Sequence, residues 1–198
     1  LKLEKDDEII ISSATHSPWL KDKNFNIFFK MIQDYTLLDN PRAYTLWQCA
    51  INVSKINGMI LDIGCLLGGS GFIMAKANKK GDTHLFDSFE GFKRDDGLHK
   101  KDIFNYNDID SVKKNILILK LKDTFVHKAY FPKNIQPKIQ KVKLCHIDIN
   151  TYKDTKNVFN FIKNKIVKGG FVIFDDFGIW GVDGIKKFIY EIEKKNSN

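Results

Sequence analysis

Two hydrophobic patterns alternate along the chain. Short apolar runs of strand length lie at 59–63, 83–87, 124–128, 142–149 and 171–174. Between them, apolar residues recur at helical spacing, which predicts helices at about 70–78, 109–120, 154–167 and 182–194, the third ended by Gly169 and Gly170. Strands that alternate with helices predict an α/β fold with a doubly wound, mostly parallel, Rossmann-like sheet.

The N-terminal quarter of the chain has a different pattern and predicts a helical lead-in. Phe25 and Phe28 begin a helically spaced apolar series, and Pro41 opens a second helix. We therefore expect a helical lead-in at 1–57 and an α/β domain at 58–198. At this chain length the two form a single globular unit.

A glycine-rich turn follows the apolar run Met59–Ile63. Gly64, Gly68 and Gly69 let the backbone approach a ligand closely. In an open α/β sheet, ligands bind beyond the carboxyl ends of the strands. Asp87 ends the next strand, where its carboxylate can accept hydrogen bonds from both hydroxyls of a ribose. The turn and Asp87 together predict a nucleoside site.

The spacing of this turn argues against a dinucleotide. The dinucleotide fingerprint is G-x-G-x-x-G, but Leu66 stands where the second glycine belongs. Asp62 would repel a pyrophosphate, whereas it suits a ligand that carries an ammonium and a sulfonium group, such as S-adenosyl-L-methionine (SAM). The alternative is a turn whose glycines meet only steric needs. The predicted SAM contacts are Asp62, Gly64, Gly68, Gly69, Ser70, Asp87 and Ser88.

Three aspartates follow two of the later strands. Asp148 lies at the end of one apolar run, and Asp175 and Asp176 follow the next. In a parallel sheet these positions share an edge with the glycine-rich turn. Clustered carboxylates repel one another and suit a hard divalent cation such as Mg²⁺. The alternative is that they cap the helices that follow. These three aspartates are the candidate metal ligands.

Composition narrows the class of protein. The chain has 198 residues, a net charge of +8 and three cysteines. The lysines are dispersed rather than interleaved with aromatic residues, which disfavours nucleic-acid binding. No apolar run is long enough to cross a membrane, and an odd number of thiols in apolar runs is typical of a reducing compartment. We expect a cytoplasmic protein that acts on a small molecule, and the sequence leaves room for a homo-oligomer.

An ordered set of motifs, at 42–46, 68–70, 87–92, 146–155 and 169–177, resembles the macrocin O-methyltransferase (TylF-like) family. The similarity covers roughly residues 42–192. It implies a class I SAM-dependent methyltransferase that uses a divalent cation to methylate a hydroxyl of a sugar or another small molecule, such as a secondary metabolite or a surface-glycan precursor. It also implies Asp148, Asp175 and Asp176 as the cation ligands.

The resemblance further implies the catalytic residues. His99 matches the family's histidine base and lies in the long polar loop 88–107, and Asp148 is the second catalytic candidate. The chain departs from the family pattern at Asn150, where a second aspartate is usual, and at Phe177, where a tyrosine is usual. We also expect the sheet to lack the family's C-terminal antiparallel strand pair, unless residues outside this sequence supply it.

Two alternative functions remain open at this point. The first is a nonenzymatic domain that senses SAM or a nucleotide. The second is an N-methyltransferase that acts on nucleic acid or protein. Enzymes that methylate nucleic-acid amino groups carry an Asn/Asp-Pro-Pro-aromatic tetrad after the fourth strand, but residues 148–151 read Asp-Ile-Asn-Thr. The second alternative is therefore the weaker one.

Overall fold

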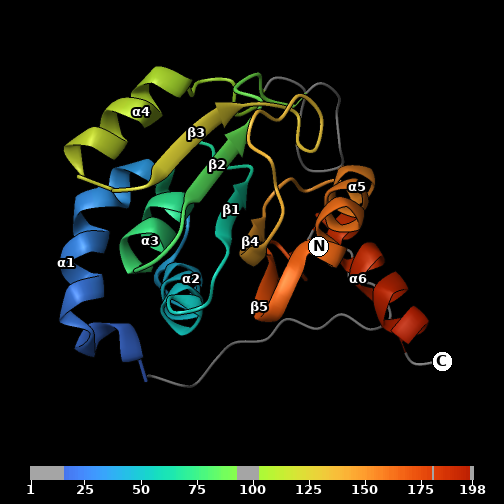
Figure 1. Ribbon diagram of the computed structural model, residues 1–198, viewed down its shortest axis with the longest axis horizontal. Helices are drawn as coiled ribbons and strands as arrows, with labels where there is room; N and C mark the ends of the chain where they lie inside the picture. Colours follow the sequence, from blue (N-terminus) through green and yellow to red (C-terminus); the bar gives the residue numbers. More distant parts are fainter. Residues whose placement is uncertain (1–15, 93–102, 180, 197–198) are drawn as a thin grey trace.

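The computed structural model describes residues 16–92, 103–179 and 181–196. Its sheet has five parallel strands in the order β3-β2-β1-β4-β5 (Figure 1). The strands are β1 (Met59–Ile63), β2 (Thr83–Asp87), β3 (Thr124–Lys128), β4 (Val142–Ile147) and β5 (Ile166–Phe174). The helices are α1 (Lys23–Ile32), α2 (Asn40–Val53), α3 (Gly69–Ala77), α4 (Ile109–Ile118), α5 (Tyr152–Ile162) and α6 (Asp183–Asn196), with short 3₁₀ turns at Pro18–Lys21, Gln33–Tyr35 and Lys163–Lys165. The predicted α/β, Rossmann-like fold is confirmed.

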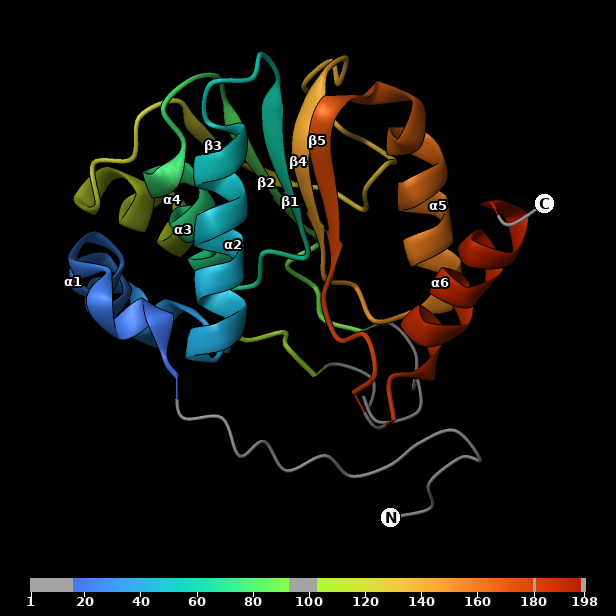
Figure 2. The same cartoon turned by 90° about the horizontal axis from the view of Figure 1, so that it is seen from below.

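Helices cover both faces of the sheet. Figure 2 shows α1, α2, α3 and α4 on one face and α5 and α6 on the other. Each face encloses an apolar core, because successive side chains of a strand point to opposite sides. On β1, Ile60 belongs to the core under α3, whereas Leu61 and Ile63 belong to the core under α5.

The N-terminal lead-in packs into the apolar core under α3 rather than forming a separate unit. Phe25 and Phe28 of α1 and Trp47 of α2 are buried in the same cluster as Phe72 and Ile73 of α3. Helix α2 begins after Asp39, whose carboxylate accepts a hydrogen bond from the backbone N–H of Arg42 at 2.9 Å. This packing fixes the start of α2 close to the sheet.

The boundary between α5 and β5 differs from the prediction. We expected one helix over 154–167 that ended at Gly169 and Gly170, but the helix ends at Ile162 and β5 begins at Ile166. Ile166 pairs with Val142 and the ladder shifts register before Phe171, so both glycines lie inside the strand. A Cβ on Gly170 would lie 2.9 Å from the carbonyl oxygen of Lys143. These glycines allow an irregular strand to approach β4, which hydrophobic spacing alone does not reveal.

The outer strands carry two further features. A loop, not a helix, links β3 to β4, and its Ala129 and Ile139 are buried against the face that α5 covers. At the other edge, β5 pairs only with β4 within the described residues. The helices of this described part are all too short or too polar to span a membrane.

Candidate active site

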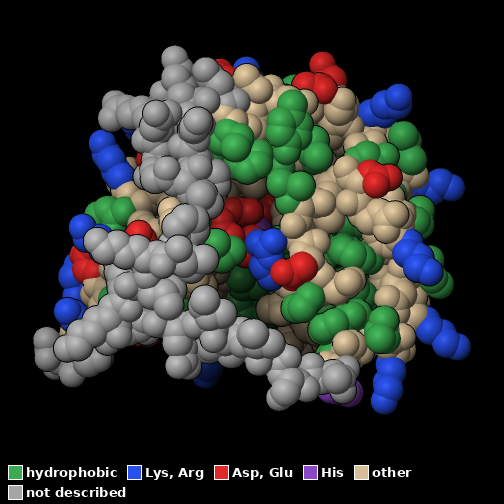
Figure 3. All heavy atoms as spheres, turned by 180° about the vertical axis from the view of Figure 1, so that it is seen from behind, with side chains coloured by type: hydrophobic (Ala, Val, Ile, Leu, Met, Phe, Trp, Pro, Cys, Tyr) green, Lys and Arg blue, Asp and Glu red, His purple; other side chains and the backbone are tan. Residues whose placement is uncertain are grey.

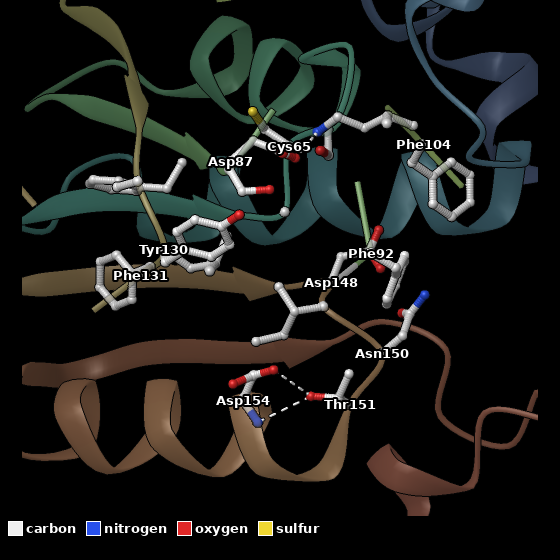
Figure 4. Close-up of a pocket in the computed structure, with 18 of the residues that line it drawn as sticks. Cys65, Asp87, Phe92, Phe104, Tyr130, Phe131, Asp148, Asn150, Thr151 and Asp154 are labelled. Carbon is white, nitrogen blue, oxygen red and sulfur yellow. Dashed lines mark hydrogen bonds between the residues drawn. The ribbon is translucent and has the colours of Figure 1, made fainter. Parts of the chain in front are cut away.

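A cavity of about 940 Å³ opens at the carboxyl edge of the sheet. Figure 3 shows a hollow near the centre of this face with acidic side chains at its floor. In Figure 4, Asp87 of β2 and Asp148 after β4 approach the cavity from the two strands that flank β1, and Phe92 and Phe104 lie across from Tyr130 and Phe131. Its volume is near the upper end of small-molecule sites, which span about 300–1,000 Å³. The cavity therefore has room for a nucleoside and a second ligand.

The glycine-rich turn between β1 and α3 is shaped by contacts with other backbone segments. Gly64 has a φ of +92°, and a Cβ there would lie 1.9 Å from the carbonyl oxygen of Asp148. At Gly69, a Cβ would lie 2.4 Å from Thr36 Cβ and Tyr35 O. The glycines thus let neighbouring loops pack closely around the cavity. Their role in the approach of a ligand stays a prediction. Gly64, Gly69, Ser70 and Ser88 line the cavity, and Gly68, the N-cap of α3, is not among its lining residues.

Asp87 lies at the end of β2 and lines the cavity. Its two carboxylate oxygens accept hydrogen bonds from the backbone N–H groups of Leu66 and Phe89, each at 2.8 Å. Burial raises the pKa of Asp87, and these two hydrogen bonds act in the opposite direction. Each carboxylate oxygen has a second acceptor site, so Asp87 is oriented and can still accept from ribose hydroxyls.

Asp62 lies behind the cavity wall and has no exposed surface. One of its oxygens accepts from the Ser70 hydroxyl at 2.7 Å, and the other lies 2.8 Å from Nδ1 of His146. Ser70 lines the cavity, whereas Asp62 does not. Direct contact between Asp62 and SAM stays a prediction, and in this arrangement Asp62 reaches the cavity through Ser70.

The predicted aspartates lie close together. Two basic side chains that the prediction missed, those of Arg42 and His146, lie beside them. Nη1 of Arg42 lies 3.2 and 3.1 Å from the two oxygens of Asp175 and 3.5 Å from Asp176. Nε2 of His146 lies 3.8 Å from Asp175. In the amide orientation that satisfies its neighbours, the Asn150 side-chain nitrogen lies 2.8 Å from Asp176 and 3.3 Å from Asp148. Asn150 thus links two of the aspartates.

Negative and positive side chains oppose one another in this cluster. Burial lowers the pKa of His146, but the hydrogen bond to Asp62 and the charges of Asp62, Asp148 and Asp175 raise it to about 9. Burial and the nearby aspartates raise the pKa of Asp148 to about 8, against the opposite effect of His146. When all four are ionised, Asp62, Asp148, Asp175 and Asp176 carry four negative charges, and among the contacts named above between described residues Arg42 and His146 supply two positive charges against them.

A divalent cation fits this charge balance. Atoms of His146, Asp148 and Asp175 lie within 4.8 Å of one another, close enough to surround one ion. A protonated imidazole has no lone pair for a metal, so His146 is better suited to hold Asp62 and Asp175 in place. Asp148 and Asp175 are therefore the better supported ligands. Asp176 joins the group through Arg42 and Asn150.

The predicted residues are thus distributed in three ways. Asp87, Asp148 and Asp176 line the cavity, and Asp175 is buried beside it with 8% of its surface exposed. His99 lies outside the described residues. Arg42 and His146 were missed as site residues, although both lie in the motifs that carry the family resemblance. The β1–β4 register, which places His146 beside Asp62, is what the sequence did not reveal.

Comparison with known proteins places this site in a family. The family model of macrocin-O-methyltransferase (TylF) matches residues 30–197. The O-methyltransferase NovP superposes with a TM-score of 0.71 at 18% identity, covering 82% of this chain and 75% of NovP. CalS11, a calicheamicin methyltransferase, superposes with a TM-score of 0.63 at 15% identity, covering 96% of this chain and 91% of CalS11. An O-methyltransferase from Bacillus cereus in complex with SAH superposes with a TM-score of 0.61 at 16% identity, covering 88% of this chain and 80% of that enzyme. No curated protein sequence matches the chain.

The structural similarities, at these identities, show the fold. The family model goes further, because it matches most of the chain, including both the glycine-rich turn and the acidic cluster. The sequence motifs and the family match agree on the same class of enzyme. The chain belongs to the macrocin-O-methyltransferase (TylF) family and is a SAM-dependent O-methyltransferase.

Proposed function

We propose that this enzyme methylates a hydroxyl group of a sugar with the help of a divalent cation. The observation that carries the proposal is the group of carboxylates at Asp148, Asp175 and Asp176 beside the cavity that also contains the glycine-rich turn. CalS11 is described as a TDP-rhamnose 3'-O-methyltransferase, which supports a sugar, and in particular a nucleotide sugar, as the acceptor. The cavity volume is consistent with a donor and such an acceptor bound together.

The donor side of the proposed site is built by β1 and β2. SAM supplies an electrophilic methyl group when it is bound. Asp87 is proposed to accept hydrogen bonds from the ribose hydroxyls. The rest of the donor is proposed to contact other residues that line the cavity, namely Gly64, Gly69, Ser70 and Ser88. The buried Ser70–Asp62 hydrogen bond holds the start of α3 in position. Orientation of this kind contributes to rate because it fixes the reacting atoms in a productive geometry.

The acceptor side is built by the ends of β4 and β5. Asp148, Asp175 and Asp176 are proposed to hold Mg²⁺ or a similar divalent cation, which supplies Lewis-acid stabilisation of a developing alkoxide. His146 fixes the orientation of Asp175 and Asp62 from behind. Asn150 provides an uncharged contact to Asp148 and Asp176, where the family usually has a second aspartate.

The proton of the acceptor hydroxyl needs a base. His99 remains our proposed base, on the strength of the family resemblance alone. Asp148, the second catalytic candidate from the family resemblance, is the alternative within the described residues, because its carboxylate lines the cavity. The two assignments differ in outcome, since His99→Ala should lower kcat by about 10²–10⁴-fold only if His99 is the base.

A cytoplasmic location and a homo-oligomeric state also stay predictions.

The proposal is tested by transfer of radiolabelled methyl from SAM to a panel of nucleotide sugars, free sugars and phenols. We expect transfer to at least one sugar hydroxyl, loss of transfer in EDTA, and recovery when Mg²⁺ is restored. Transfer that EDTA leaves unchanged would remove the cation from the proposal. Transfer to phenols but to none of the sugars would overturn the acceptor class.

A further inference from the structure

Arg42 occupies an unusual position for an arginine near a cation site. It lies in the first turn of α2, and its guanidinium bonds both oxygens of Asp175 and approaches Asp176. Nη2 also donates to the carbonyl oxygen of Leu37 at 3.2 Å, and Nε lies 3.5 Å from Asp39. One side chain therefore ties the start of α2 and the preceding loop to the end of β5.

We propose that Arg42 is a built-in counter-ion of the acidic cluster, and that a divalent cation which binds there displaces it. This inference rests on the cation role proposed above. The reason is direct competition, because the guanidinium already contacts both oxygens of Asp175, one of the proposed cation ligands. A metal ion on the same carboxylate would lie within a few ångströms of a second positive charge, where repulsion is strong at the low effective dielectric of a partly buried site.

Displacement of Arg42 has a structural consequence for the cavity. The loop whose Leu37 carbonyl accepts from Arg42 lines the cavity through Tyr35, Thr36, Leu37 and Leu38. When Asp175 exchanges the guanidinium for a metal ion, the tether between this loop and β5 is released. Arg42, which has 35% of its side chain exposed and itself lines the cavity, then becomes available to an anionic group of the acceptor. Cation binding would thus prepare the acceptor side of the cavity.

The composition of the chain allows this exchange to be observed directly. Arg42 and Arg94 are the only arginines in the sequence. Protein labelled with [¹⁵N]arginine should therefore give two side-chain Nε–H signals, and the Arg42→Lys variant assigns the one that belongs to Arg42. We expect Mg²⁺ to shift or broaden the Arg42 signal in the wild-type protein. An Arg42 signal that stays unchanged at a Mg²⁺ concentration that saturates binding would overturn the inference.

A calorimetric titration with Mn²⁺ supplies the second test, and its readout does not depend on activity. Arg42→Met keeps an unbranched side chain but removes the competing charge, so we expect Mn²⁺ to bind about tenfold more tightly than to the wild type, equivalent to about 1.4 kcal/mol. Lys153→Met is the matched control, because Lys153 is an exposed cation that also lines the cavity. This variant tests the effect of removing a positive charge that lies near the site without contacting Asp175. We expect its Mn²⁺ affinity to differ from that of the wild type by less than about twofold.

The outcomes separate this inference from the proposed function. Equal Mn²⁺ affinity in the wild type and Arg42→Met, or an equal gain in Arg42→Met and Lys153→Met, would overturn the displacement and leave the cation role intact. Absence of Mn²⁺ binding in all three proteins would overturn both. A thermal melt of Arg42→Met confirms that it is folded, and the NMR experiment on wild-type protein does not depend on that variant.

Discussion

The two sides of the cavity are built in different ways. On the donor side, Asp87 is held by the N–H groups of Leu66 and Phe89, which are 21 and 2 residues away in the sequence. On the acidic side, Asp175 is held by Arg42, which is 133 residues away, and His146 contacts Asp62 across 84 residues. The donor side is thus a local motif, whereas the acidic side is a charge balance assembled by the whole fold. Substitutions on the acidic side should therefore lower activity, whereas substitutions on the donor side should weaken SAH binding.

Asp175→Asn should produce the largest effect on catalysis. It removes a charge from the acidic side while keeping nearly the same shape, and we expect kcat/KM to fall by about 10²–10³-fold, as for the loss of one electrostatic stabilising group. Affinity for SAH, measured by calorimetry, should stay within about twofold because the donor side is intact. Asp110→Asn, on the exposed surface of α4, is the matched control. Equal loss of SAH binding and activity would show that the two sides are not separable.

Gly64→Ala should produce the largest effect on stability, because Gly64 lies where the two sides touch. Its added Cβ would overlap the Asp148 carbonyl oxygen, so we expect a loss of at least about 3 kcal/mol in the free energy of unfolding. Gly178→Ala is the control, since Gly178 has a similar φ of +81° but no neighbour within 4 Å. It should cost about 1–2 kcal/mol, the cost of the left-handed conformation alone. Equal losses in urea unfolding would contradict the steric explanation.

The pH dependence of stability tests the charge balance of the acidic side. The folded-state pKa of His146, about 9, is above its ordinary value of 6.5. Its stabilising contribution is therefore complete below pH 6.5 and is lost as the pH rises through 9. Between pH 7 and pH 9 we expect His146 to lower the free energy of unfolding by about 2 kcal/mol, with Asp148, whose pKa is also raised, acting in the same direction.

Urea unfolding at pH 7 and pH 9 measures this loss. The window begins at pH 7 because His84 and His127, whose folded-state pKa values are lowered, are then largely neutral in both the folded and the unfolded state. His146→Gln, which cannot titrate, should show a smaller difference between the two pH values. Wild-type protein that is equally stable at pH 7 and pH 9 would contradict the account of His146 as a buried cation.

Asp87→Asn should produce the smallest of these effects, and only on the donor side. The amide keeps one acceptor but loses the charge that strengthens hydrogen bonds, so SAH should bind about tenfold more weakly. Asp82→Asn, just before the opposite end of β2, is the control and should leave SAH affinity unchanged. Activity at saturating SAM should fall much less in Asp87→Asn than in Asp175→Asn. A reversed order would mean that the two sides have been assigned the wrong way round.

The same contrast explains what the sequence could predict. The strands, the glycine-rich turn, Asp87 and the three clustered aspartates follow from hydrophobic spacing and from the shared edge of a parallel sheet. The end of α5 was misplaced because pairing with β4 overrides helical spacing at Ile166. Arg42 and His146 could not be assigned, because their roles depend on long-range packing and on strand register, which no local pattern encodes.

The central claim is that one cavity holds a donor against Asp87 and a cation between Asp148 and Asp175. A crystal grown with SAH and Mn²⁺, with diffraction data collected at the manganese absorption edge, tests it most directly. The account predicts ribose hydroxyls within hydrogen-bonding distance of Asp87 and an anomalous peak bound by Asp148 and Asp175, with Arg42 moved away from Asp175. SAH bound elsewhere, or no anomalous peak at these aspartates, would contradict it.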